Sequence, residues 1–76
     1  MLPTINMQKT GENIRYLRKK SGLTVRKVQK TFGFTTAQAI YKWENGRSIP
    51  SVDNLVALSD LFNVSIEDIL IVERNI

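Results

Sequence analysis

The fourteen residues from 33 to 46, GFTTAQAIYKWENG, constrain the fold of this chain more than any other part of it. A glycine stands at each end, and a residue just past a helix end commonly adopts the left-handed conformation that only glycine takes at little cost. Between the glycines, Thr35 and Thr36 can each accept a backbone N–H as an N-cap. Ile40 and Trp43 lie three positions apart on one helix face. The segment therefore predicts the end of one helix and then a second, short helix that ends at the second glycine. This short helix has one buried face and other faces free for contact.

Helix caps and apolar spacing predict four further helices. Thr10 and Thr24 can each cap a helix, and a glycine follows the expected end of both. Ser51 follows a proline at the start of the next helix, and Ser65 begins the last one in a capping box with Asp68. No segment predicts a strand. The expected helices cover residues 10–22, 24–33, 35–46, 51–62 and 65–70.

Three stretches follow one another in the order TVRKVQKTFGF, AIYKWENG and SIPSVDNLVALSDLFNVSIEDIL. In order and spacing they resemble the phage-repressor-like helix-turn-helix family, also called the XRE family, over about residues 11–70. The resemblance implies an all-α fold, a compact five-helix repressor-like DNA-binding domain. Its helix-turn-helix is formed by the helices expected over residues 24–33 and 35–46, and the second of these enters the major groove.

Length and composition favour a single soluble domain. Seventy-six residues suffice for one small core, and 42% apolar content without a long apolar run argues against a membrane span. We expect residues 1–9 to be an N-terminal arm and a candidate for disorder, residues 10–72 to be the DNA-binding domain, and residues 73–76 to be a C-terminal tail. The absence of cysteine and of a secretory signal pattern fits a cytoplasmic location.

The charge of the chain is unevenly distributed. Residues 1–42 carry nine Lys and Arg side chains against one Glu, for a net charge of +8, whereas residues 43–76 carry two against six acidic side chains, for −4. A basic half that includes the expected reading helix suits a polyanion, because Lys and Arg release counterions when they neutralise phosphates. Solvated charged helix faces account for the same pattern without a ligand.

The resemblance also implies which residues contact DNA. Gln38 matches a position that reads base edges, and its amide can pair with adenine, while Lys42 can reach guanine or a phosphate. Thr36 is expected at a phosphate, Ala37 at a thymine methyl group, and Tyr41 at sugar or phosphate. The loop over residues 45–48 resembles a phosphate clamp that uses backbone N–H groups as much as side chains. The remaining residues that the resemblance assigns to DNA binding are Arg26, Thr35, Asn45, Gly46, Arg47 and Ser48.

Two departures from the family pattern affect this transfer. The segment over residues 33–40 is one residue longer than usual, so either Thr35 or Thr36 caps the reading helix, and the readers rotate by about a third of a turn between the two cases. The family commonly has a phosphate-binding Gln just after the residue that Thr24 matches, where this chain has Val25. Arg26 either substitutes for it or serves only solubility.

These observations favour a sequence-specific double-stranded DNA-binding transcription regulator that acts as a repressor. A homodimer on a near-palindromic site is expected, because one short helix reads few base pairs. The C-terminal residues Ile71, Val72 and Ile76 offer a surface for self-association, although Ile71 or Val72 could equally complete the monomer core.

Other functions are opposed by the sequence to different degrees. The chain has no His or Cys and no glycine-rich phosphate loop, so no enzyme, metal site or cofactor is expected, and no small-molecule effector or membrane partner is indicated. The competing hypothesis is a protein-interaction module, such as an antitoxin or accessory subunit, that uses the same fold. Binding of duplex DNA at moderate salt would discriminate the two.

Overall fold

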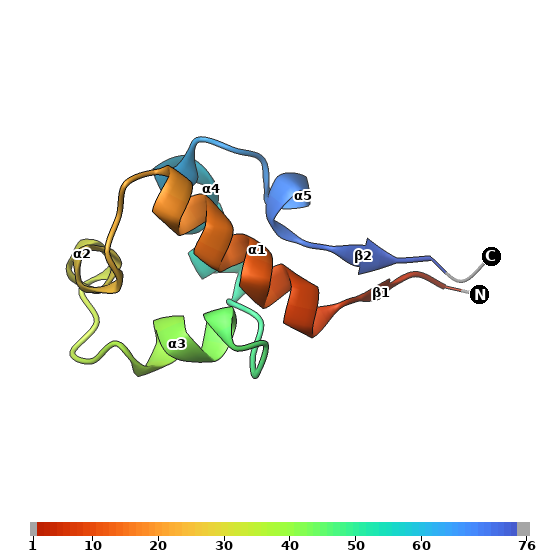
Figure 1. The fold of residues 1–76 in the computed structure, drawn as a ribbon, viewed down its shortest axis with the longest axis horizontal. Coiled ribbons are helices and arrows are strands. Elements are labelled where there is room, and N and C mark those ends of the chain that lie inside the picture. Colours follow the sequence, from red (N-terminus) through yellow and green to blue (C-terminus); the bar gives the residue numbers. More distant parts are fainter. Residues whose placement is uncertain (1, 75–76) are drawn as a thin grey trace.

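The computed structural model describes residues 2–74 and contains five helices and a short sheet within them. As Figure 1 shows, α1 runs through the middle of the molecule, with α2 and α4 toward its C-terminal end, α3 beside it, and a two-stranded ribbon beyond its N-terminal end. The prediction of a compact five-helix fold is confirmed. The elements are β1 Thr4–Ile5, α1 Met7–Lys20, α2 Val25–Phe32, α3 Gln38–Glu44, α4 Val52–Phe62, α5 Ile66–Ile69 and β2 Val72–Glu73.

The hydrophobic core lies between α1 and the other four helices. Helical spacing accounts for its composition, since buried apolar residues three or four positions apart share one face of a helix. Trp43 is buried, as predicted, and packs edge-on against Phe32 and Phe34, with ring centroids 5.9 Å from each. The buried apolar residues are Ile14, Leu17, Val28, Ile40, Trp43, Leu55, Leu58, Phe62 and Ile69.

Three predicted N-caps are confirmed. The Thr24 hydroxyl accepts a hydrogen bond from the Lys27 N–H at 3.0 Å, at the start of α2. Ser51 caps α4, and Ser65 forms the predicted capping box with Asp68 at the start of α5. Each cap pairs an N–H group that has no partner inside its helix. None of the helices in the described part of the chain is long and apolar enough to cross a membrane.

The first helix begins earlier than its sequence suggests. Asn6 is the N-cap of α1, with its side-chain oxygen accepting the Lys9 N–H at 2.8 Å, so the prediction that Thr10 caps this helix is wrong. Thr10 lies inside α1, four residues before Ile14 and on the same buried face. Its hydroxyl accepts the Ile71 N–H at 2.9 Å, so it serves a tertiary hydrogen bond and not a cap.

A two-stranded antiparallel ribbon joins the two ends of the described chain, and the prediction of no strand is therefore wrong. Thr4 pairs with Glu73 and Ile5 with Val72. Strands of two residues are too short to show the alternation by which a strand is predicted. Residues 4–9, predicted as part of an N-terminal arm that is a candidate for disorder, form β1, the N-cap of α1 and the start of that helix. The remaining domain boundaries stay predictions, and Ile76, like Met1 and Asn75, lies outside the described residues.

Candidate nucleic-acid interface

Helices α2 and α3 are joined by a turn that is tied to both of them. Gly33 ends α2 in the left-handed region with φ 70°, as predicted, and the Phe34 N–H donates to the Gln29 carbonyl at 3.0 Å. The rings of Phe32 and Phe34 lie 5.3 Å apart, and both pack against Trp43 of α3. The aromatic contacts therefore connect the end of α2, the turn and α3 in one cluster.

Helix α3 buries one side and exposes the other. Ile40 and Trp43 are 1% and 4% exposed, whereas Gln38, Tyr41 and Lys42 are exposed to solvent. The exposed three are spaced i, i+3 and i+4, so they form one stripe along the helix. This stripe can meet a ligand without any change in the core.

The start of α3 differs from the prediction. Ala37 occupies the N-cap position and has no side-chain cap, so neither Thr35 nor Thr36 is the N-cap. The Thr36 hydroxyl instead accepts the Gln38 N–H at a long 3.4 Å. Residues 35–37 form a bend that precedes Gln38, the first helical residue.

The loop after α3 uses its backbone N–H groups internally. The N–H groups of Asn45, Gly46 and Arg47 donate to carbonyls of α3 at 2.9–3.1 Å, and that of Ser48 does so at 3.4 Å. These donors are therefore occupied in the described chain, in contrast to the expected clamp that uses backbone N–H groups. The side chains of Asn45 and Arg47 are exposed and remain available to a phosphate.

The first turn of α2 places cations beside a helix N-terminus. Val25 is partly buried and packs against the core. Arg26 and Lys27, the next two residues, are exposed. The partial positive charge of a helix N-terminus favours anions, and the two cationic side chains add to it. This end of α2 is therefore suited to a phosphate group.

The exposed charged side chains of the helix-turn-helix and the loop after it are all basic. Between residues 24 and 48 the sequence holds five cationic side chains and one carboxylate, Glu44. The Glu44 side chain is 6% exposed and lies in an ion pair with Arg18 of α1. The five cations are all exposed. Because the one carboxylate is buried and paired, no exposed negative charge of this segment opposes their field. They are Arg26, Lys27, Lys30, Lys42 and Arg47.

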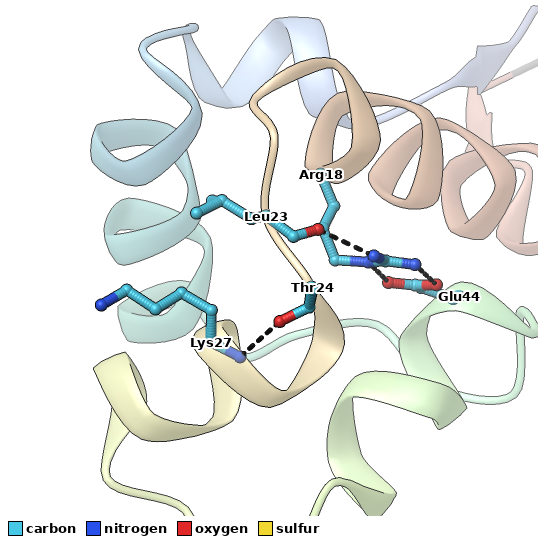
Figure 2. A network of polar contacts seen from close by, with 5 residues as sticks. All are labelled: Arg18, Leu23, Thr24, Lys27 and Glu44. Carbon is cyan, nitrogen blue, oxygen red and sulfur yellow. Dashed lines mark hydrogen bonds and ion pairs between the residues drawn. The ribbon is translucent and has the colours of Figure 1, made fainter.

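The ion pair of Arg18 and Glu44 is bidentate (Figure 2). The Arg18 Nε donates to Glu44 Oε2 at 2.7 Å, and Nη2 donates to Oε1 at 3.1 Å. Its Nη1 donates to the Leu23 carbonyl at 2.9 Å, in the linker before α2. The hydrogen bond to Glu44 raises the pKa of Arg18 above its ordinary value, against the opposing effect of burial. Each nitrogen of the guanidinium therefore donates a hydrogen bond within the protein.

A glycine lets α1 approach the end of α3 closely. A Cβ at Gly11 would lie 2.4 Å from the Trp43 carbonyl oxygen and 2.7 Å from that of Glu44. Gly46 has φ 73° and packs against the backbone of α1 near Met7 and Gln8, so its role in the monomer is structural.

The residues predicted to bind DNA come from consecutive elements of the helix-turn-helix. Sequence reasoning did not single out Gly11, Arg18, Glu44, Lys27 or Lys30. Arg18 could have been found from its spacing, because it follows buried Ile14 by four residues on α1. Of the predicted residues, Arg26, Thr35, Thr36, Gln38, Tyr41, Lys42, Asn45 and Arg47 are exposed, and Ala37, Gly46 and Ser48 are partly buried.

Comparison with known proteins agrees with this geometry. A model of a helix-turn-helix family, HTH_3, matches residues 14–69. The structure is similar to that of the S. venezulae BldD DNA-binding domain, with a TM-score of 0.71 and 23% identity over 86% of this chain and 96% of that chain. A crystal structure of the DNA-binding domain of BldD gives 0.70 and 23% over 84% and 92%. At this identity the likeness concerns the fold. No curated protein matches the chain.

Proposed function

This chain belongs to the XRE-type helix-turn-helix family, and we propose that it is a sequence-specific double-stranded DNA-binding transcription regulator, acting as a repressor in the cytoplasm. In this proposal α3 enters the major groove and the first turn of α2 meets the backbone. The single observation that carries the proposal is the one-sided charge of residues 24–48, where five cations are exposed and the only carboxylate is buried in an ion pair.

Two sets of side chains have different roles in the proposed complex: one reads base edges and the other contacts phosphates. Gln38 and Lys42 lie one turn apart on the exposed stripe of α3, and their types suit adenine and guanine edges respectively. Tyr41, between them in sequence, adds a hydroxyl for sugar or phosphate. We infer that Thr35, Thr36 and Ala37, in the turn before α3, approach the same groove from its edge.

The phosphate contacts come from either side of this stripe. Arg26 and Lys27 extend from the first turn of α2, and Asn45 and Arg47 extend from the loop after α3. Such contacts position the helix without reading sequence. Because the loop N–H groups already have acceptors, these contacts fall to side chains.

We infer that the protein binds as a homodimer, and the ribbon of β1 and β2 is the surface that supports this. Leu2, Ile5, Met7 and Val72 are 84%, 42%, 40% and 41% exposed, so four apolar side chains gather near the two ends of the described chain. Burying such side chains against a second copy would remove them from water. Val72→Asp should shift sedimentation toward monomer and lower affinity for a full site more than for a half-site. Unchanged sedimentation would remove the ribbon from the dimer interface.

Selection of bound sequences from a random duplex pool, followed by titration in salt, tests the proposed function directly. A preferred sequence should emerge, and its affinity should fall steeply with salt, corresponding to about four to eight neutralised phosphates per dimer. A failure to select any duplex, or a flat salt response, would favour the protein-interaction alternative.

Alanine variants separate the two sets of side chains. Gln38→Ala and Lys42→Ala should each cost about 1–3 kcal/mol on the selected duplex and relax base preference. Arg47→Ala should weaken binding to all duplexes alike and lower the salt slope of the dimer by about two, one for each protomer. Lys20→Ala removes an exposed cation from the end of α1 and serves as the control, with little effect on either measure. Equal behaviour of the variants across a panel of sites would contradict the assigned groove geometry.

A further inference from the structure

One buried side chain, that of Arg18, connects α1, α3 and the linker before α2. Arg18 extends from α1 and is not among the residues proposed to contact DNA. It donates hydrogen bonds both to Glu44 of α3 and to the Leu23 carbonyl. Leu23 immediately precedes Thr24, the N-cap of α2. Figure 2 shows the guanidinium between these two partners, with the capped first turn of α2 next to them.

The geometry of this contact is directional. A guanidinium and a carboxylate that share two hydrogen bonds must lie nearly in one plane, so the pair restricts rotation as well as distance. The two side chains are only 10% and 6% exposed, which keeps competing water away from them. A buried ion pair of this kind often contributes no more stability than apolar residues of similar volume. Its distinctive property is therefore the orientation that it imposes.

The position of Glu44 makes that orientation matter for the reading residues. Glu44 is the last residue of α3, and Gln38 is the first, so they lie about 9 Å apart along the helix axis. A tilt of about 20° at the Glu44 end moves Gln38 by about 3 Å, which exceeds the tolerance of a hydrogen bond to a base. At the Gln38 end, Ala37 supplies no side-chain cap.

We propose that Arg18 and Glu44 are positioning residues for DNA recognition: their ion pair sets the angle of α3 relative to the first turn of α2, so that base-reading and phosphate-binding side chains meet the duplex together. The inference rests on the proposed DNA-binding function and concerns specificity. Neither residue touches DNA. Loss of the pair should thus alter the choice among sequences while the exposed cations still hold any duplex.

The test replaces the pair with apolar residues, Arg18→Met with Glu44→Leu, which leaves the net charge of the chain unchanged. The probes are the duplex that the parent selects from a random pool and a scrambled duplex of the same length. The ratio of the two affinities should fall at least about tenfold, the scale of one lost base contact, while affinity for the scrambled duplex stays within about twofold. Lys20→Met with Glu67→Leu is a matched control, since both residues are exposed and the charge again cancels.

Two further measurements decide the remaining cases. Arg18→Lys keeps the charge and loses the bidentate geometry, so it should lower the ratio of the two affinities by a smaller factor. This variant tests the proposal if the apolar double variant does not fold. An unchanged ratio in the folded variants would overturn the positioning role. If the parent selects no duplex, the proposed function fails. The orientation of α3 against α1, measured by residual dipolar couplings, then tests the pair by itself, and an unchanged orientation in the apolar variant would overturn it.

Discussion

The two ends of α3 are held in opposite ways. At its C-terminal end, Glu44 is paired with Arg18, Trp43 is buried, and the backbone lies against Gly11 of α1. At its N-terminal end, Ala37 makes no side-chain cap and the nearest hydroxyl contact, from Thr36, is 3.4 Å long. More contacts therefore hold α3 at the end farther from Gln38 than at the end that carries it. Thr35 and Thr36, in the turn before it, are exposed to a ligand.

Glu44→Ala should have the largest effect, because it leaves the Arg18 guanidinium buried without its carboxylate. Truncation of one partner of a buried pair typically costs about 3–5 kcal/mol of unfolding free energy. Urea denaturation followed by helical circular dichroism measures it. Glu67→Ala, at an exposed position of α5, is the control and should stay within about 0.5 kcal/mol of the parent. A cost for Glu44→Ala below 1 kcal/mol would mean that this end of α3 is not held by the pair.

Gly11→Ala tests the backbone contact at the same end of α3. The new methyl group would approach two carbonyl oxygens that cannot swing away as a flexible side chain does, so we expect a loss of about 2–3 kcal/mol. This loss should appear although alanine favours helices by about 1 kcal/mol over glycine. The same denaturation series measures it, and a stabilised variant would contradict the close approach.

Gly33→Ala probes the turn that leads to the free end of α3. Here the backbone is left-handed, with φ 70°, but no described atom outside the neighbouring residues lies within 4 Å of an added Cβ. Only conformational strain opposes the substitution, at about 1–2 kcal/mol. Melting curves of the two glycine variants should therefore rank Gly33→Ala as the milder. The reverse order would show that the turn, and not the α1 contact, carries the larger constraint.

Thr36→Val should have the smallest effect on stability, within about 0.5 kcal/mol, since it removes only one long hydrogen bond at an exposed position. Thr24→Ala provides the comparison, because it removes an N-cap bond of 3.0 Å and should cost about 1 kcal/mol. A calorimetric comparison of the pair at equal pH is sufficient. If Thr36→Val cost as much as Thr24→Ala, the free end of α3 would be capped after all.

Local sequence determined most of the helices of this protein. The caps Thr24, Ser51 and Ser65 act within three residues of themselves, so their function could be inferred from neighbours in the chain. The burial of Trp43 follows from its spacing to Ile40, which is also local. The family resemblance, confirmed by the match over residues 14–69, supplied the order of elements and the expected DNA contacts.

Tertiary structure alone decided the features that join distant residues. Thr10 has the type of a cap, yet its hydroxyl pairs with Ile71, and Asn6 takes the cap position instead. Spacing places Arg18 on the buried face of α1 with Ile14, but only the packing of α1 on α3 brings it to Glu44 and buries the two together. The ribbon depends on the meeting of chain ends about seventy residues apart. Local propensity and periodicity act over a few residues, whereas a cap lost to a tertiary hydrogen bond, a buried ion pair and a two-residue strand exist only once the chain has folded.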